Sequence, residues 1–414
     1  MKITVQRNFF YQLLLALCLA VPYVGSYEVT FVLWSFTALV TLQKNYSFPF
    51  LKYLSCFVLI LAIAFFSTKL ERYNLFFIIR DITYLLKPIL GLVVGYQLCK
   101  YNYQKAFGTI ANIGFWISRI HLIFLVIAVV FFKAYTVNDL RLHGGYFSDF
   151  EIYVLVLILF HKEFNIELSR KRFYIMAFTV GISSFLYLSR TNFIQFFILF
   201  FALKGYFVLN KRAIIAILSL IAITIISYTI ILYINPRRNG EGMEAFLYKI
   251  KVAPTEPFKS KIKTDDYIDF NDNYRSVETI NTLKQMQNKG TEAVVLGAGL
   301  GSKVDLKQEV YLGDMKMRYI SVMHNAFMTT YLKSGIVGII ILLFSIYLVY
   351  NQPKSSIPIN NTINFMLVGT AIFLVVSNWV LMGYYFTEDS KSILVGFFIA
   401  YKEITQKVTN RVSS

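Results

Sequence analysis

Charged residues are scarce in this sequence, and their scarcity restricts the class of protein. Asp, Glu, Lys and Arg make up only 15% of the 414 residues, whereas about a quarter is usual in soluble domains. Hydrophobic residues make up 57%, and the 39 Phe and 29 Tyr carry more aromatic surface than one soluble core buries. These proportions exclude disordered and collagen-like chains and predict an integral membrane protein.

Cysteine is also rare, and the patterns of metal and nucleotide sites are missing. Each of the three cysteines, Cys18, Cys56 and Cys99, lies in an apolar stretch, so we expect neither a disulfide framework nor a CxxC metal site. The acidic run at 265–272 lacks the glycine and the twelfth-position Glu of a calcium loop. The glycine-rich segment 296–301 is not framed as a nucleotide-binding loop would be. We therefore expect no metal and no cofactor.

Acidic residues are outnumbered by basic ones, 23 against 41, which gives a net charge of +18. Such a charge suggests nucleic acid in a soluble protein. In a membrane chain it is typical of basic cytoplasmic loops beside anionic lipid. We therefore predict membrane lipid and no nucleic acid as a partner.

The apolar runs predict an all-α polytopic membrane protein with about twelve membrane-spanning helices, because about 20 helical residues cross a bilayer. The first run follows Lys2 and Arg7 and lacks a small-residue cleavage site, so we interpret it as a retained span and not a signal peptide. The predicted spans lie near 9–26, 28–43, 51–68, 76–99, 108–132, 148–162, 173–189, 191–209, 213–233, 324–350, 361–383 and 390–403.

The distribution of basic residues predicts the orientation. An even number of spans puts both termini on one side, and the short loops of that side carry most of the Lys and Arg, so we expect cytoplasmic termini. Between 234 and 323 the hydropathy collapses, which predicts one large external loop. The predicted organisation is helices over 1–233, the external loop over 234–323, and further helices with a cytoplasmic tail over 324–414.

Inside the loop, apolar residues recur every three positions at Val277, Ile280, Leu283 and Met286. This stripe predicts a short amphipathic helix that lies on the membrane, caps a cavity, or packs within the loop. The chain shows no internal repeat, which disfavours a transporter built from duplicated halves.

A histidine lies where the chain re-enters the membrane after the loop. His324 and Asn325 open the span at 324–350, where the positive end of the helix macrodipole disfavours an imidazolium. A neutral imidazole can accept a proton, so His324 is a candidate general base. The position equally suits an interfacial histidine that bonds a carbonyl or a headgroup.

Arginines on the predicted external side are candidate anion ligands. Arg190 lies at a polar break between two spans and Arg275 lies just before the stripe, and planar guanidinium groups suit phosphate oxygens. The alternatives are an arginine that reaches lipid headgroups and a solvated loop charge. Arg141, in another external loop, is either a further candidate donor or part of an ordinary turn. Asp389, in the last external loop, is either a carboxylate that orients a base or a solvated side chain.

Taken in order, these features resemble the bacterial O-antigen ligase and polymerase superfamily. The resemblance is carried by Ser189-Arg190-Thr191, Tyr274-Arg275, the glycine-rich segment 296–301, His324-Asn325 and the Gly-Ile-Val-Gly at 335–338. It covers about 141–338 and, through the number of spans, the architecture as a whole.

The resemblance implies a membrane glycosyltransferase of the GT-C type in the bacterial inner membrane. It would use an undecaprenyl-pyrophosphate-linked oligosaccharide as donor, need no metal, and invert the anomeric carbon. By the same resemblance, Arg190 and Arg275 would hold the pyrophosphate, with Arg141 as a further ligand. His324 would be the general base, and Asp389 would orient it.

The motifs leave the acceptor open. A polymerase would transfer the chain to another lipid-linked repeat unit, with a chain-length regulator as a further partner. A ligase would transfer it to the lipid A core of lipopolysaccharide or to a protein. We favour the polymerase, because His324-Asn325 continuing to Gly335 resembles polymerase members more closely.

Two other classes of function compete with an enzyme. A flippase or transporter for lipid-linked glycans needs ionisable residues around a midplane cavity. Here the charges within spans reduce largely to Arg80, Asp81, Lys87 and Arg119, which favours chemistry at the outer face. A receptor or scaffold would tolerate replacement of each candidate site residue.

Overall fold

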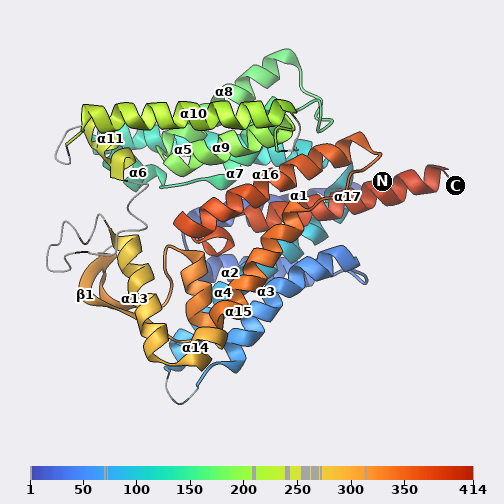
Figure 1. Ribbon diagram of the computed structural model, residues 1–414. Coiled ribbons are helices and arrows are strands. Elements are labelled where there is room, and N and C mark those ends of the chain that lie inside the picture. Colours follow the sequence, from blue (N-terminus) through green and yellow to red (C-terminus); the bar gives the residue numbers. More distant parts are fainter. Residues whose placement is uncertain are drawn as a thin grey trace. The chain divides into compact units, whose positions relative to one another are not determined.

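The computed structural model describes residues 2–69, 71, 73–207, 211–237, 243–252, 262, 270, 273–312 and 315–413. The described chain is mostly helical and contains one β-hairpin (Figure 1). It divides into two compact units. Unit 1 comprises 1–61, 79–204 and 340–414, and unit 2 comprises 62–78 and 205–339.

Unit 1 is built from helices, several of which begin at a side-chain cap. The hydroxyls of Ser26, Thr136, Ser148 and Ser169 each accept a hydrogen bond from the backbone N–H three residues later, which satisfies one donor of the first turn. The elements are α1 (Lys2–Ala20), η1 (Val21–Val24), α2 (Tyr27–Val40), α3 (Phe48–Phe66), α4 (Leu75–Asn102), η3 (Tyr103–Lys105), α5 (Ala106–Phe132), α6 (Val137–Gly144), α7 (Asp149–Leu159), α8 (Arg170–Leu186), α9 (Arg190–Leu203), α16 (Pro358–Val380), η5 (Gly383–Tyr385) and α17 (Lys391–Ser413). Helices α3, α4 and α15 continue from one unit into the other.

Helix α7 lies at the centre of unit 1. Its residues from Asp149 to Ile158 are all buried, and it packs against α5, α8 and α9. Helix α9 packs in turn against α16. A helix that is apolar on every side is stable only inside a bundle, so α7 organises the helices around it.

Each apolar run predicted as a span forms a helix, but fewer of these helices have the length and composition of a crossing. Helices α2, α7 and α9 have 14, 11 and 14 residues, whereas a bilayer needs about 20. The prediction of about twelve crossings is therefore not supported by the helix lengths. Four stretches of the described chain are long and apolar enough, namely Phe48–Phe66, Leu75–Phe132 (α4, η3 and α5), Ala326–Tyr350 and Pro358–Val380.

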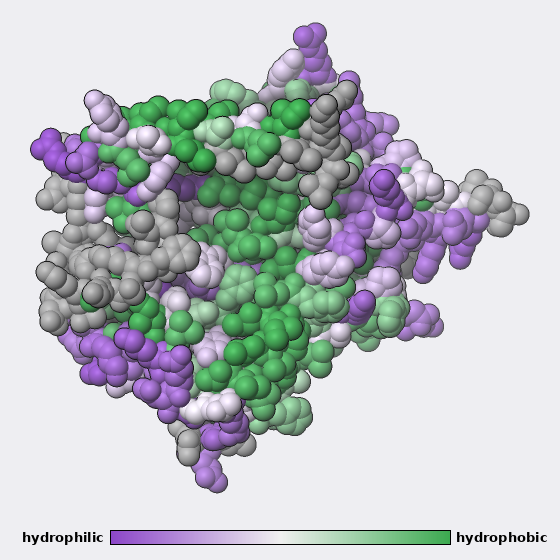
Figure 2. Space-filling model, in the orientation of Figure 1, coloured by the Kyte–Doolittle hydropathy of each residue, from purple (hydrophilic) through white to green (hydrophobic). Residues whose placement is uncertain are grey.

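The surface of unit 1 carries many exposed apolar side chains, as expected of a membrane protein. On the second half of α15 (Ala326–Tyr350), Ile340, Leu343, Phe344 and Tyr347 are each more than 40% exposed. Figure 2 shows hydrophobic side chains gathered over α15 and α3. Soluble monomers rarely expose contiguous apolar patches of this kind, whereas lipid covers them at no cost.

Unit 2 spans the whole of the predicted external loop, together with α10 before it, the first half of α15 after it, and residues 62–78. A β-hairpin, which the all-α prediction missed, pairs Val304 with Ile320 and Leu312 with Met315 in antiparallel register. The elements are α10 (Lys211–Ile234), α11 (Met243–Val252), α13 (Tyr274–Asn288), α14 (Thr291–Leu296), β1 (Val304–Leu312), β2 (Met315–Ile320) and the first half of α15.

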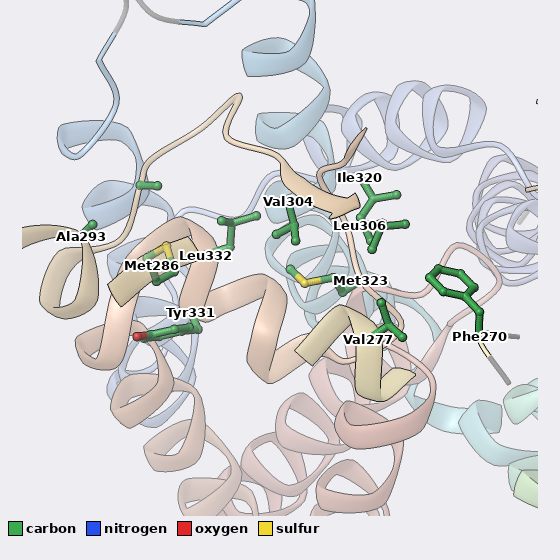
Figure 3. Close-up of a cluster of buried hydrophobic side chains, with 11 residues drawn as sticks. Phe270, Val277, Met286, Ala293, Val304, Leu306, Ile320, Met323, Tyr331 and Leu332 are labelled. Carbon is green, nitrogen blue, oxygen red and sulfur yellow. The ribbon is translucent and has the colours of Figure 1, made fainter. Parts of the chain in front are cut away.

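The hairpin, α13 and α15 share one hydrophobic core, shown in Figure 3. Val304, Leu306 and Ile320 of the hairpin point toward Val277 of α13 and toward Met323, just before α15 (Figure 3). Of the predicted stripe on α13, Val277 and Met286 belong to this core, whereas Leu283 is 39% exposed and Ile280 is half-buried. The stripe therefore packs within its own unit, which is the third of the three interpretations left open by the sequence.

The glycine-rich segment joins α15 by direct backbone contacts. Gly335 has φ +66° inside α15, and this break leaves the carbonyls of Leu332 and Lys333 to accept hydrogen bonds from Ala298 N (2.8 Å) and Gly299 N (3.3 Å). A Cβ on Gly335 would lie 2.2 Å from the Val295 oxygen. The two glycine motifs thus form a structural joint between α14 and α15, because only residues without Cβ allow this approach.

We expect Gly335→Ala to destabilise unit 2. The positive φ costs of order 1–3 kcal/mol for a residue with Cβ, and the contact with the Val295 oxygen adds to it. Thermal unfolding of the detergent-solubilised chain, followed by far-ultraviolet circular dichroism, measures the effect.

Gly108→Ala is the matched control for this substitution. Gly108 lies in α5, and a Cβ there would meet no atom within 4 Å. Alanine favours a helix over glycine by about 1 kcal/mol, so this variant should match or exceed the stability of the parent. Equal midpoints for the two variants would mean that the joint contributes nothing.

Candidate functional site

His324 lies two residues before α15, at the end of the segment that returns from the hairpin. The N-terminus of α15 is capped by Asn325, whose Oδ1 accepts hydrogen bonds from Phe327 N (2.9 Å) and Met328 N (3.2 Å). His324 therefore precedes the cap and is not in the first turn, where the sequence placed it. Its chemical partner is a side chain from another helix.

That partner is Glu278, which lies on the second turn of α13. Its Oε1 lies 3.0 Å from His324 Nδ1, and its Oε2 accepts a hydrogen bond from the His324 backbone N–H at 3.0 Å. The side chain of Glu278 is 1% exposed, whereas that of His324 is 42% exposed. One carboxylate thus fixes both the backbone and the ring of His324, and the ring still reaches the surface of the unit.

Tyr274 and Arg275 lie one turn earlier on α13. The ring of Tyr274 meets the imidazole of His324 edge-on, with centroids 5.5 Å apart and planes at 83°. Burial, and then the charge of Glu278, raise the pKa of the Tyr274 phenol well above its usual range. Arg275 is half-buried and lies three residues before Glu278, a spacing that puts both on one side of the helix.

This arrangement can act as a base. A carboxylate that contacts Nδ1 selects the tautomer with the proton on Nδ1, which leaves the lone pair on Nε2. The same carboxylate stabilises the imidazolium that forms when Nε2 takes a proton. Two of the residues singled out from the sequence, His324 and Arg275, thus both belong to unit 2, and Arg275 lies on the helix that carries Glu278.

Arg190 belongs to unit 1, as the first residue of α9. The predicted polar break before it exists, because α8 ends at Leu186 and Leu188 takes a positive φ of 52°. Arg190 is exposed, and the turn before it is held by a hydrogen bond from the side-chain Nδ2 of Asn192 to the Ser184 carbonyl (2.8 Å).

Arg141 also belongs to unit 1, near the end of the short helix α6. Its guanidinium lies 5.1 Å from the ring centre of Tyr146, at cation–π distance. Burial lowers the pKa of Arg141, and Tyr146 opposes the shift. The group remains charged near neutral pH, because an arginine starts from a pKa above 12.

Asp389 is part of a buried ion cluster in unit 1. Lys391 Nζ contacts both the Asp389 carboxylate and Asp149 Oδ2, the latter at 3.2 Å, and Lys87 Nζ donates to the Asp389 carbonyl at 2.7 Å. The side chains of Asp149, Asp389 and Lys391 are at most 1% exposed. Asp389 is therefore not a solvated loop residue, and the carboxylate that contacts His324 is Glu278.

Sequence reasoning missed Glu278 because one carboxylate in a polar loop has no pattern of its own. A usable signal was its spacing, since Glu278 follows Tyr274 and Arg275 by one helical turn. The acidic run at 265–272 lies outside the described residues except for Phe270. Among the residues that the structure describes, no group of three His, Cys, Asp or Glu side chains could hold a metal ion.

Comparison with known proteins adds no assignment. No protein-family model matches the chain, and no curated protein matches it either.

Beside the buried cluster, Glu388 gives unit 1 a pH dependence. Burial first, and the charge of Asp149 second, raise the pKa of Glu388 to about 7, and Lys87 opposes the shift. A carboxyl with a raised folded-state pKa stabilises fully below its unfolded pKa, and the contribution is lost as pH rises through 7.

We expect Glu388→Gln to remove this dependence. At pH 8 the variant should be more stable than the parent by about 1–2 kcal/mol, after allowance for partial exposure, and at pH 4 the two should agree. Thermal midpoints in detergent between pH 4 and 8 provide the measurement, with Glu292→Gln, an exposed residue, as control. A difference that is constant over this range would show that Glu388 titrates normally.

Proposed function

We propose that the protein is a membrane glycosyltransferase that polymerises a surface polysaccharide of the O-antigen kind. It would transfer an undecaprenyl-pyrophosphate-linked glycan to a hydroxyl of another lipid-linked repeat unit. The observation that carries the proposal is the contact between His324 Nδ1 and the buried carboxylate of Glu278. The ordered sequence motifs supply the substrate class.

The proposed step needs one base and one stabilised leaving group. Nε2 of His324 takes the proton of the acceptor hydroxyl as the hydroxyl oxygen bonds to the anomeric carbon. The bond from that carbon to the pyrophosphate oxygen breaks on the opposite face, so the configuration inverts. The electron pair of the broken bond leaves with undecaprenyl pyrophosphate, and the proton stays on the imidazolium that Glu278 stabilises.

The leaving pyrophosphate calls for cationic donors near the base. Arg275 is supported in this role by its place on α13, one turn before Glu278 and next to Tyr274. Its guanidinium can donate to two phosphate oxygens at once. The roles of Arg190 and Arg141 rest on the sequence resemblance alone, since both belong to unit 1.

The proposal includes a location and a topology. The four long apolar helical stretches support insertion in a membrane. The charge distribution of the loops supports cytoplasmic termini, with the segment 234–323 outside the bacterial inner membrane. Passage of the shorter helices through the bilayer as well, giving about twelve crossings, is part of this proposal.

A transporter of lipid-linked glycans is the second candidate. The buried cluster of Lys87, Asp149, Asp389 and Lys391 places more ionisable groups inside unit 1 than the sequence suggested. Buried charges in a membrane protein often serve a transport path. Here, however, Lys391 contacts both carboxylates, which equally suits structural pairing.

We expect His324→Ala to abolish chain growth, because the acceptor hydroxyl loses its base. The measurement is the glycan profile of cells that contain normal amounts of the variant, with lipid-linked intermediates resolved from glycan on its final acceptor. Loss of long chains, with single repeat units still transferred, identifies a polymerase. His161→Ala is the matched control, since His161 lies in the turn after α7 and its Nδ1 is 3.1 Å from the carbonyl oxygen of Ile158.

Two other profiles would contradict the polymerase. Long lipid-linked chains that accumulate without reaching an acceptor would identify a ligase. An unaltered glycan profile would exclude His324 as the general base. It would favour a transporter or a scaffold over an enzyme.

We expect Glu278→Gln to lower the rate by about 10²-fold or more, within the range that base catalysis contributes. A glutamine cannot accept from both donors of His324 and carries no charge to stabilise the imidazolium. The pH at which activity reaches half its plateau should shift downward. Both quantities come from elongation assays on purified protein with a lipid-linked repeat unit.

Glu292→Gln serves as the control for Glu278→Gln, because Glu292 is exposed in the same unit. A merely structural Glu278 would predict lower yield of folded protein, with the half-plateau pH of the remaining activity unchanged. That outcome would remove Glu278 from the proposed mechanism.

A further inference from the structure

Unit 1 contains a groove of about 920 Å³ that the proposed chemistry does not use. It is lined by one side of α1, by η3 and the first half of α5, and by the loop between α7 and α8 with the first turn of α8. The volume lies within the range of small-molecule and cofactor sites. All its lining residues belong to unit 1.

One end of the groove is polar and carries two cationic side chains. Lys105 lies in η3 and Arg172 lies in the first turn of α8, and both are exposed. Asn112 Oδ1 accepts a hydrogen bond from Arg172 Nη2 at 2.8 Å, which orients the guanidinium and leaves its other N–H groups for a ligand. The carboxylate of Glu167 also lines this end, so Lys105, Arg172 and Glu167 together carry a net charge of +1.

The backbone adds to the positive potential at this end. Helix α5 begins at Ala106 without a side-chain cap, and Gly108 and Thr109 of its first turn line the groove. The N-terminus of a helix of 27 residues carries about half a positive elementary charge. An anionic group is favoured there, because the uncapped N-terminus and the two cations act together.

The rest of the groove is apolar. Leu13 of α1 and Trp116 and Ile120 of α5 line it, and their side chains are 46%, 59% and 51% exposed. A surface of this kind in a membrane protein is covered by hydrocarbon. The groove therefore has the chemistry of an amphiphile, with an anionic head at one end and an acyl chain along the other.

We propose that this groove binds one anionic phospholipid of the membrane. Its phosphate lies between Lys105 and Arg172, and an acyl chain runs along Leu13, Trp116 and Ile120. The site is independent of the proposed glycosyl transfer, because none of its residues belongs to the candidate base or its partners. Basic pockets between helices on the cytoplasmic side of membrane proteins favour anionic headgroups, and the charge distribution puts this end of unit 1 on that side.

Native mass spectrometry of the delipidated full chain in detergent tests the proposal. Phosphatidylglycerol, phosphatidylethanolamine and phosphatidylcholine are each added at several concentrations, and the occupancy of the first bound lipid is measured. We expect phosphatidylglycerol to bind more tightly than the two zwitterionic lipids. Each of Lys105→Ala and Arg172→Ala should weaken it about fivefold, since a basic residue near the headgroup contributes about that factor.

The control and the apolar wall make the test specific. Lys171→Ala removes an exposed neighbouring charge that does not line the groove, and it should leave the affinity unchanged. Trp116→Ala should weaken all three lipids alike, because the contact it removes is with the chain. If inorganic phosphate displaced the bound lipid as effectively as a competing lipid does, the groove would be a site for free anions, and the proposal would be overturned. Equal binding of the three lipids, or an unaffected double variant of Lys105 and Arg172, would overturn it too.

Discussion

A chain this apolar must satisfy its own polar groups, and that constraint explains most of its structure. Backbone N–H and C=O groups have no water to bond in hydrocarbon, so the apolar runs form helices. Buried charges must likewise meet partners, and Lys391 does so with Asp149 and Asp389. The hairpin and α13 escape this constraint because they belong to the polar segment. There, backbone pairing and a small apolar core of their own hold the fold.

The same constraint separates what the sequence could predict from what it could not. Helices appear at every predicted apolar run, because hydrophobicity over a long window is a strong signal. The crossings were harder to count, since α7 is as apolar as a span but has only 11 residues, of which Asp149 to Ile158 are buried by protein. Hydropathy does not distinguish burial by neighbouring helices from burial by lipid. The hairpin was missed because Asp305 and Lys307 alternate with Val304 and Leu306 over too few residues to stand out.

The candidate site shows a similar division. His324, Arg275 and the break before Arg190 could be identified from residue type and position. The contact with Glu278 could not, because it depends on how α13 packs beside the residues that precede α15. The sequence does not show which carboxylate contacts His324, and for that reason Asp389 was a candidate for the orienting residue. The glycine motifs contribute to the family resemblance, and the structure gives them a physical role as the joint between α14 and α15.

Unit 2 assembles the candidate base from a short stretch of the chain. Tyr274, Arg275, Glu278 and His324 lie within one subdomain, on one helix and the segment that returns to α15. The described contacts that fix the base lie within unit 2, among them the core around Val277 and Met323. In the proposed reaction, Arg190 and Arg141 would contact the substrate and would not contribute to that geometry, because they belong to unit 1. Under the proposed mechanism, loss of a unit 1 arginine should thus change how the rate depends on substrate concentration, whereas loss of Glu278 should change how the rate depends on pH.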